Sequence, residues 1–274
     1  MSFTTIRSNT YAALSRVMLD RINRRAARNM LALSSGKRIN STEDDAAGFA
    51  LARDLKARKA GLQQAMDNIG NAQSLLNIAA GSHQVIVDNL SRIRDLVLVG
   101  ADDAYNVAQR NAIQGQINAL IEEMDDTVDV TNFQGKVLLD GSFSGRSLQF
   151  GAEATDTFIV SIEDVRISAL GLAGIDVSNN AVATTSLANI DDALQTLFDA
   201  MQATGEILMR LDAKLNNHQR QVIALESSRS HIEDIEYGNA QYRMLRTQLI
   251  QQLDFNALNQ AVVAPRQVLS LIVS

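Results

Sequence analysis

Apolar side chains recur every seven residues through a long, proline-free stretch in the first half of the chain. The repeat has two columns, of which the second lies three residues after the first. The first column consists of Leu55, Leu62, Ile69, Leu76, His83, Leu90 and Val97, and the second of Arg58, Ala65, Ala72, Ala79, Ile86 and Ile93. A repeat held over about six heptads is typical of coiled coils and predicts one helix from about residue 44 to residue 99. At about 1.5 Å per residue this helix is on the order of 80 Å long, and it needs other helices to cover its apolar columns.

The same repeat returns in the second half and predicts a helix over about residues 190–236. Its two columns are Ile190, Leu197, Thr204, Leu211, His218, Leu225 and Ile232, and Leu194, Met201, Leu208, Leu215 and Val222. This helix would be roughly 70 Å long, which is comparable with the first. The side chains expected to fill the seam of the bundle are Leu55, Leu62, Ile69, Leu76, Leu90, Leu197, Leu208, Leu211, Leu215 and Leu225.

Between the two long helices the pattern changes twice. Apolar residues on one face of 113–128 predict a shorter helix, and the short connection before it implies that this helix folds back antiparallel on the first. Residues 147–150 and 157–162 are β-prone and predict a small hairpin around a turn at 151–156. Residues 170–186 have the composition of a loop.

Both ends of the chain are helix-prone and amphipathic. Residues 4–33 have helical spacing and an arginine-rich face, which is either a solvated face or, as we favour, the mark of an interaction helix. Ser34-Ser35-Gly36 predicts the end of this helix, and Ser41 or Thr42, followed by three carboxylates, is expected to cap the next. The C-terminal segment is again helix-prone, and neither terminal helix has an obvious partner in the molecule except the other.

These patterns predict a mainly α fold. Long antiparallel helices form a rod-like coiled-coil bundle with a small β-hairpin region, and the N- and C-terminal helices pair. We expect four parts: an N-terminal helix over 1–43, two helices and the hairpin over 44–186, the second long helix over 187–237, and a C-terminal helix over 238–274.

The composition fits long helices better than a compact mixed core. The chain is 46% hydrophobic but only 4% aromatic, and it has one proline. A net charge of −6 gives no reason to expect nucleic-acid binding. The absence of cysteine excludes disulfides and thiolate metal sites. No apolar run is long enough to cross a bilayer, and the first residues do not resemble a cleavable signal peptide.

No pattern of residues indicates catalysis. His83 and His218 each replace an apolar residue in a heptad column, so they could face one another, but a metal site would need a third ligand that no spacing provides. Two hydrogen-bonded core histidines are the simpler interpretation. The acidic run at 122–126 is interpreted as a solvated helix face. We therefore predict a protein that is not an enzyme and that holds no cofactor or metal.

Eight short motifs in one order resemble bacterial flagellin. They are LSSGKRIN at 33–40, DDAAG at 44–48, SRIRDL at 91–96, NFQGKVLL at 132–139, LQFGA at 148–152, SALGL at 168–172, SRSHIED at 228–234 and PRQVLSLI at 265–272. The resemblance covers both halves of the chain and leaves only residues 173–186 without a match. The hairpin leads almost directly into the second long helix, so the variable outer domains of long flagellins have no room here.

The resemblance implies a structural subunit that polymerises with copies of itself into the extracellular flagellar filament and serves swimming motility. It also implies partners: the flagellar type III export apparatus, which needs no cleaved signal peptide, a flagellin chaperone, and the junction and cap proteins. In the family the terminal helices pair in the inner tube of the filament, and the long helices form the outer tube. The polymerisation residues expected on the inner-tube helices are Leu14, Val17, Ile22, Leu33, Leu245, Leu249, Leu253 and Leu269.

A host Toll-like receptor senses flagellins, and its contact pattern falls here on Arg92, Leu96 and Gln116. The third residue is a glutamate in strongly recognised flagellins, so this chain departs from the pattern. The alternative function is the hook–filament junction protein, which shares the two-ended helical design but does not self-polymerise. A helical protein of membrane surfaces would also use an arginine-rich helix, but this one has few aromatic anchors.

Overall fold

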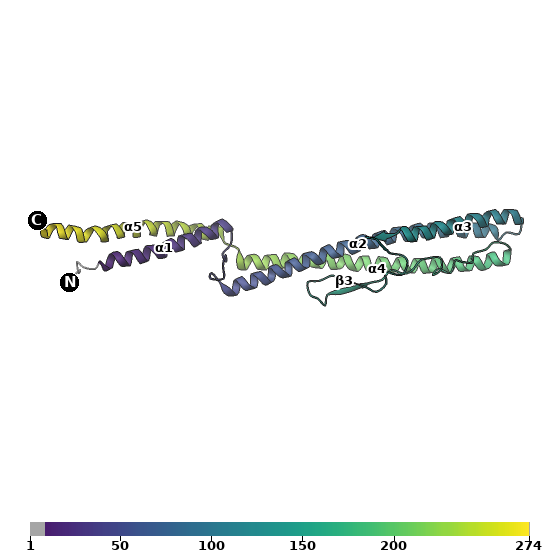
Figure 1. Ribbon diagram of the computed structural model, residues 1–274, viewed down its shortest axis with the longest axis horizontal. Helices are drawn as coiled ribbons and strands as arrows, with labels where there is room; N and C mark the ends of the chain where they lie inside the picture. The colour runs from purple at the N-terminus through teal and green to yellow at the C-terminus, as the bar shows by residue number, and fades with distance from the viewer. Residues whose placement is uncertain (1–8, 274) are drawn as a thin grey trace. The chain divides into compact units, whose positions relative to one another are not determined.

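The computed structural model describes the backbone of residues 9–273 and the side chains of residues 9–263. This part of the chain is mainly helical, with five helices and two small antiparallel hairpins, as predicted. The helices are α1 (Thr10–Ser35), α2 (Ala46–Gly100), α3 (Val107–Val130), α4 (Asn180–Glu233) and α5 (Tyr237–Val273), and the strands are β1 (Asn132–Phe133), β2 (Lys136–Val137), β3 (Arg146–Gln149) and β4 (Thr157–Val160) (Figure 1).

The chain divides into two compact units. Unit 1 comprises residues 1–57 and 224–274, and unit 2 comprises residues 58–223. Unit 1 therefore includes the first turns of α2 and the last turns of α4. The four parts expected from the sequence stay a prediction.

In unit 1, α1 and α5 lie side by side (Figure 1), which confirms the predicted pairing of the terminal helices. The side chain of Asn9 accepts a hydrogen bond from Ala12 N and caps the start of α1. Gly36 ends the helix with a φ of 70°, a left-handed conformation that glycine adopts without steric cost. The predicted stop at Ser34-Ser35-Gly36 is therefore confirmed.

The cap of α2 differs from the prediction. Asp45 Oδ1 accepts a hydrogen bond from Gly48 N at 2.9 Å, so Asp45 rather than Ser41 or Thr42 caps this helix. Asp44 turns the other way, and its carboxylate accepts hydrogen bonds from the backbone amides of Asn40 and Ser41. These bonds, the Asn40 amide first, lower the pKa of Asp44. The acidic run thus shapes the bend before α2 as well as starting the helix.

In unit 2, α2 and α4 run antiparallel. Asn68 of α2 donates a hydrogen bond to Gln149 O, and His218 of α4 bonds to the next carbonyl, Phe150 O, so residues 68 and 218 lie at the same height along the helix pair. Farther along the pair, Arg94 of α2 forms an ion pair with Asp191 of α4. Residue numbers therefore rise along one helix as they fall along the other. Both helices share one apolar core with α3 and the hairpin region.

α3 folds back on α2, as predicted. A capping box between Asn106 and Gln109 starts α3, and Thr131 at its end donates a hydrogen bond to Ser82 of α2 at 2.8 Å. The buried side chains of Ile117 and Met124 join the common core.

The predicted hairpin is present as β3 and β4, with Arg146 opposite Val160 and Gln149 opposite Thr157. A second, two-residue hairpin, β1–β2, was not predicted. Its turn residues Gln134 and Gly135 both have positive φ, which is typical of a tight type I′ turn.

The prediction of a loop over 170–186 is wrong in its second half, because α4 begins at Asn180. Asn179 Oδ1 accepts from Val182 N, and Ser186 Oγ binds the backbone of Asp176, so side chains before and inside the first turns hold the helix start in place. The preceding residues Leu172 and Val177 are buried in the core, so this segment packs as part of unit 2.

We predict that Leu90→Ala destabilises unit 2 by about 2–5 kcal/mol, because Leu90 is fully buried and its truncation leaves a cavity. Val85→Ala, on the exposed side of the same helix, is the matched control and should change the free energy of unfolding by less than about 1 kcal/mol. Urea unfolding followed by circular dichroism measures both. Equal effects would contradict the assignment of Leu90 to the core.

Candidate assembly surface of the terminal helices

The seam between α1 and α5 consists largely of small and polar side chains. The buried or half-buried positions of the two helices follow a heptad spacing. On α1 they are Ala12, Ser15, Leu19, Ile22, Ala26, Asn29, Ala32 and Leu33, and on α5 they are Ala240, Met244, Thr247, Gln251, Asp254, Leu258, Ala261 and Val262. Only a minority of the side chains buried between the two helices are therefore large and apolar.

Four hydrogen bonds cross this seam. They run from Asn9 Nδ2 to Ala261 O at 2.7 Å, from Gln251 Nε2 to Asn23 Oδ1 at 2.8 Å, from Asn29 Nδ2 to Thr247 Oγ1 at 3.2 Å, and from Tyr237 OH to Leu33 O at 3.1 Å. Along these four hydrogen bonds the residue number on α5 falls as the residue number on α1 rises, so the two helices are antiparallel. Polar partners at defined levels fix the register, because a slip by one turn would leave these groups unpaired.

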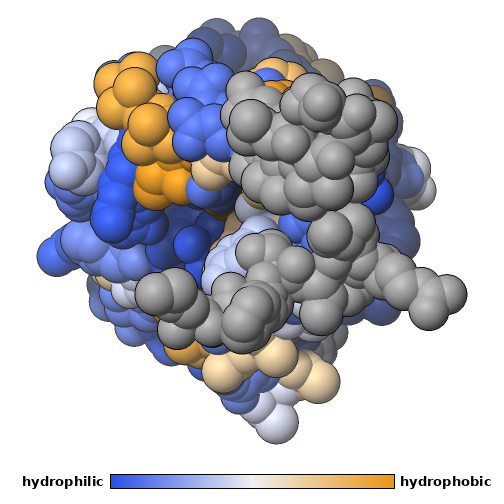
Figure 2. Space-filling view, turned by 90° about the vertical axis from the view of Figure 1, so that its left-hand side faces the viewer, coloured by the Kyte–Doolittle hydropathy of each residue, from blue (hydrophilic) through white to orange (hydrophobic). Residues whose placement is uncertain are grey.

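The large apolar side chains of the pair lie on its outer surface. Those exposed by more than two fifths on α1 are Tyr11, Leu14, Val17, Met18, Met30 and Leu31, and those on α5 are Tyr237, Tyr242, Leu245, Leu249, Leu253, Phe255 and Val263. Figure 2, which faces the left-hand side of Figure 1, shows apolar patches beside strongly polar ones. Thirteen such side chains among the described residues of one helix pair are typical of a surface that another protein covers.

The structure divides the predicted polymerisation residues between two faces. Leu14, Val17, Leu245, Leu249 and Leu253 point outward, and each is about half exposed or more. By contrast, Ile22 is buried and Leu33 half-buried in the seam. Leu269 lies in α5, but its side chain falls outside the described residues.

Sequence reasoning missed several outward residues, among them Tyr11, Leu31 and Phe255. A signal for them was available. Ala12, Leu19, Ala26 and Leu33 form a seven-residue column that marks the seam side of α1, and the remaining apolar residues therefore face out.

A cluster of charges joins the two connecting segments of unit 1. Arg229 forms ion pairs with Glu226 at 2.9 Å, Glu233 at 2.6 Å and Asp234 at 3.2 Å, and Lys37 pairs with Glu233 at 2.6 Å. The backbone pairs as well, because Arg38 N donates to Glu233 O and Ile235 N donates to Gly36 O. The segment between α1 and α2 is thus held against the segment between α4 and α5.

The pKa values of this cluster follow from its geometry. Partial burial would raise the pKa of Glu233, but the hydrogen bonds and charges of Lys37 and Arg229 outweigh it, so the pKa is lowered. Hydrogen bonds to Glu226 and Glu233 raise the pKa of Arg229. Both groups are therefore charged at neutral pH, and the cluster strengthens the joint as the pH rises above the range in which carboxylates titrate.

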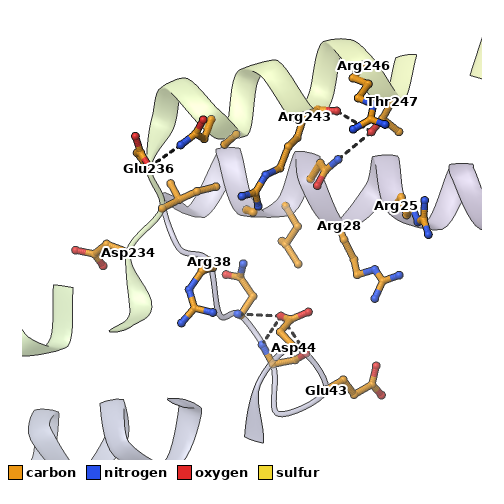
Figure 3. Close-up of a pocket in the computed structure, with 18 of the residues that line it drawn as sticks. Arg25, Arg28, Arg38, Glu43, Asp44, Asp234, Glu236, Arg243, Arg246 and Thr247 are labelled. Atoms are coloured by element: carbon orange, nitrogen blue, oxygen red, sulfur yellow. Dashed lines mark hydrogen bonds between the residues drawn. The ribbon is translucent and has the colours of Figure 1, made fainter. Parts of the chain in front are cut away.

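A groove of about 830 Å³ lies beside this joint, between α1, the segment before α2, and α5. Arginines from both helices line it: Arg25 and Arg28 from α1, and Arg243 and Arg246 from α5 (Figure 3). We call these four side chains the arginine groove. In Figure 3, Arg28 and Arg243 are the two of these four that lie nearest to Asp44, whose carboxylate is held by the backbone, and Arg25 and Arg246 lie farther along their helices.

The two core histidines of unit 2 have different surroundings. His218 bonds to Phe150 O at 2.6 Å and so ties α4 to the hairpin region. His83 is completely buried, and neither of its ring nitrogens has a hydrogen-bond partner among the described residues. Burial lowers the pKa of His83 to about 4, so this side chain is neutral at pH 7. Within the described residues no group of three or more side chains is placed to hold a metal ion.

The residues expected along the long seam lie at several depths. Leu62, Ile69, Leu76, Leu90, Leu197 and Leu211 are buried, Leu208 and Leu215 are half-buried in unit 2, and Leu55 and Leu225 are half-buried in unit 1. Among the residues of the receptor pattern, Arg92 and Gln116 are exposed and Leu96 is half-buried. None of the helices in the described part of the chain is long and apolar enough to span a bilayer.

Two protein-family models match the chain. The model of the bacterial flagellin N-terminal helical region matches residues 6–144, and that of the bacterial flagellin C-terminal helical region matches residues 187–272.

Known proteins show the same likeness. Flagellin of Halalkalibacterium halodurans is 29% identical over 88% of this chain and 89% of that protein, and flagellin of Bacillus subtilis is 29% identical over 91% and 93%. Flagellin B of Vibrio anguillarum is 31% identical over 68% of this chain but only 50% of that protein.

Among solved structures, Bacillus cereus flagellin aligns with a TM-score of 0.51 and 27% identity over 56% of this chain and 88% of that one. A Vibrio parahaemolyticus protein assigned as a flagellar hook-associated protein aligns with a TM-score of 0.60 and 16% identity over 70% of this chain and 100% of that one. The second likeness shows the fold alone.

We predict that His83→Leu removes part of the pH dependence of unit 2 stability. The folded pKa near 4 lies below the ordinary histidine pKa of 6.5, so the unfolded chain binds more protons between these values and stability falls as the pH drops through this window. The loss is about 3 kcal/mol at about 1.4 kcal/mol per pKa unit.

Urea unfolding of both chains at pH 8, 6.5 and 4.5 measures this effect. At pH 8 residue 83 is uncharged in both chains, so the difference there reports packing alone. The unmodified chain should lose more stability than H83L between pH 6.5 and pH 4.5. Parallel pH profiles would mean that His83 does not titrate from a buried, neutral state.

Proposed function

Because the chain belongs to the bacterial flagellin family, we propose that the outward apolar residues of α1 and α5 form the surface through which it polymerises. The chain is a structural subunit of the flagellar filament, and it assembles with copies of itself outside the cell. One observation carries the proposal: the α1–α5 seam is closed by hydrogen bonds, while leucines such as Leu14 and Leu249 are left exposed.

The size of this surface is sufficient for assembly. Burying a leucine-sized side chain contributes about 1.5–3 kcal/mol, and thirteen large apolar side chains are exposed on the described part of the pair. Association costs at least about 4–15 kcal/mol in lost freedom, so several of them must be buried together to give a stable polymer.

We further propose that the terminal segments 1–43 and 238–274 serve as the inner-tube helices of the filament. The parts 44–186 and 187–237 would then form its outer tube and carry the long seam of buried leucines. Close packing along α2 and α4 resists bending of the helices, which suits a subunit that transmits torque. Ile22 and Leu33 would act indirectly, by holding α1 against α5.

Further partners follow from membership of the family and remain proposals. They are the flagellar export apparatus, a flagellin chaperone, and the junction and cap proteins at the two ends of the filament. A host Toll-like receptor is proposed to contact Arg92, Leu96 and Gln116, of which Arg92 and Gln116 are accessible. Because Gln116 is uncharged, contacts that need a carboxylate at this position would be weakened.

We predict that Leu249→Glu prevents polymerisation, because a charge buried in an apolar contact costs far more than the contact contributes. Leu249→Met keeps the volume and apolar character, and it is the matched control. Purified monomers are seeded with filament fragments, and electron microscopy and sedimentation measure filament length and yield. Long filaments should form with the unmodified chain and with L249M but not with L249E.

A chain without residues 1–33 and 239–274 should also fail to polymerise. Normal filaments from L249E would show that α5 assembles through another face. An unmodified chain that stays monomeric, or that stops at short rings, would instead contradict self-polymerisation and fit a junction protein.

A further inference from the structure

We propose that the arginine groove of one copy binds the acidic face of α3 from a second copy. This pairing deepens the proposed assembly and rests on it. We define the acidic face as Glu122, Glu123, Asp126 and Asp129, which are all exposed on α3. It would add a charged, salt-dependent contact to the apolar contacts of α1 and α5.

The arginines of the groove form no ion pairs with the residues that the structure describes. Arg25, Arg28, Arg243 and Arg246 are exposed, and none forms a hydrogen bond or ion pair through its side chain with any residue that the structure describes. Arg28 contributes only at longer range, where its charge helps to lower the pKa of Asp44.

Three other cations in the same unit have ionic or hydrogen-bond partners. Arg229 holds three carboxylates, Lys37 holds Glu233, and Arg38 donates to Ile232 O and lies 3.8 Å from Asp45. Four acids also line the groove, namely Glu43, Asp44, Asp234 and Glu236. Asp44 is held by backbone amides, Asp234 by Arg229, and Glu236 accepts a hydrogen bond from Asn239. None of the four acids forms an ion pair with the four arginines of the groove, which are therefore open to a further anionic partner.

The spacing of the arginines suits a helical partner. Arg25 and Arg28 are three residues apart on α1, as are Arg243 and Arg246 on α5, so each helix presents a pair on adjacent turns. Guanidinium groups offer several donors each and bind carboxylates through paired hydrogen bonds. Two such pairs on either side of a groove match carboxylates repeated along one helix face.

The carboxylates of the acidic face repel one another and mostly lack cationic partners. Glu122 and Asp126 are four residues apart, and like charges at this spacing destabilise a helix by about 0.2–0.5 kcal/mol. Glu122, Glu123 and Asp126 have no ion pair with the described residues, while Asp129 reaches Arg166 at 3.4 Å. A face of this kind gains stability from a cationic partner.

Positive charge is also concentrated in unit 1, which holds the groove, and negative charge in unit 2, which holds the acidic face. Unit 1 contains 14 lysines and arginines against 10 aspartates and glutamates, whereas unit 2 contains 11 against 21. The net charge of −6 hides a basic unit and a strongly acidic one. In a homopolymer the neighbours of unit 1 are copies of the same chain, so acidic surfaces of unit 2 are the counter-charges available at high local concentration.

Two charge-reversed chains test the pairing: R243E/R246E in the groove and E122R/D126R on α3. Each chain alone should require a critical concentration for seeded polymerisation about tenfold above that of the unmodified chain in 50 mM salt. The defect should shrink to less than about threefold in 500 mM salt, because ions screen exposed charges. An equal mixture of the two reversed chains should polymerise nearly as well as the unmodified chain, since each groove then meets a complementary face on the other chain.

Two controls separate charge from folding. R243K/R246K keeps the charge and should polymerise within about twofold of the unmodified chain. Circular dichroism and thermal unfolding of all variants must match, so that a loss of structure is not mistaken for a lost contact.

The outcomes distinguish this inference from the proposed function. Reversed chains that polymerise normally in low salt would overturn the pairing but leave the apolar assembly surface intact. Two impaired chains that do not rescue each other would overturn the choice of α3 as the partner and point to another anion in the groove. Failure of the unmodified chain to form filaments would instead overturn the proposed function.

Discussion

Hydrogen bonds between α1 and α5 determine which side chains of the two helices face outward. Asn29 donates to Thr247 and Gln251 donates to Asn23, so the seam between these helices holds polar groups at fixed levels. Because polar and small residues occupy much of the inside, most of the large apolar residues lie outside. A leucine-rich seam would bury the same side chains within one chain and leave none for a neighbour. The polarity of the seam is thus the reason that the pair offers an apolar surface.

A second constraint acts at the joint of unit 1. Gly36 ends α1 in a conformation with positive φ, Asp44 folds the following segment, and Asp45 starts α2. Opposite this segment, Glu233 accepts from Lys37 and Arg229 at the end of α4. Ion pairs and backbone hydrogen bonds therefore hold the segment between α1 and α2 against the segment between α4 and α5. Such a joint keeps its geometry without a large apolar core, which a helix pair of this width cannot provide.

The sequence was informative wherever apolar side chains repeat at fixed spacing. The heptads through Leu62 and Leu90 located α2, and those through Leu197 and Leu211 located α4, because burial follows the period of the helix. The terminal helices were predicted less well. The prediction grouped Ile22, which is buried in the α1 seam, with Leu14, which is exposed. Small residues such as Ala12 and Ala26 occupy much of the seam column, so the large apolar residues alone do not mark the buried side. The start of α4 at Asn180 was likewise missed, since its first turn is fixed by side-chain hydrogen bonds.

Polar groups inside the long seam show the same trade between stability and specificity. His83 occupies a column in which Leu76 and Leu90 are its neighbours, yet its ring nitrogens have no partner among the described residues. A leucine there would pack with less cost, but a column of identical leucines could slip by one heptad without penalty. His218, which replaces an apolar residue on α4, binds Phe150 O and marks one level of that helix. Long repeats need such irregular positions, because uniform apolar columns hold helices together without defining which turns meet.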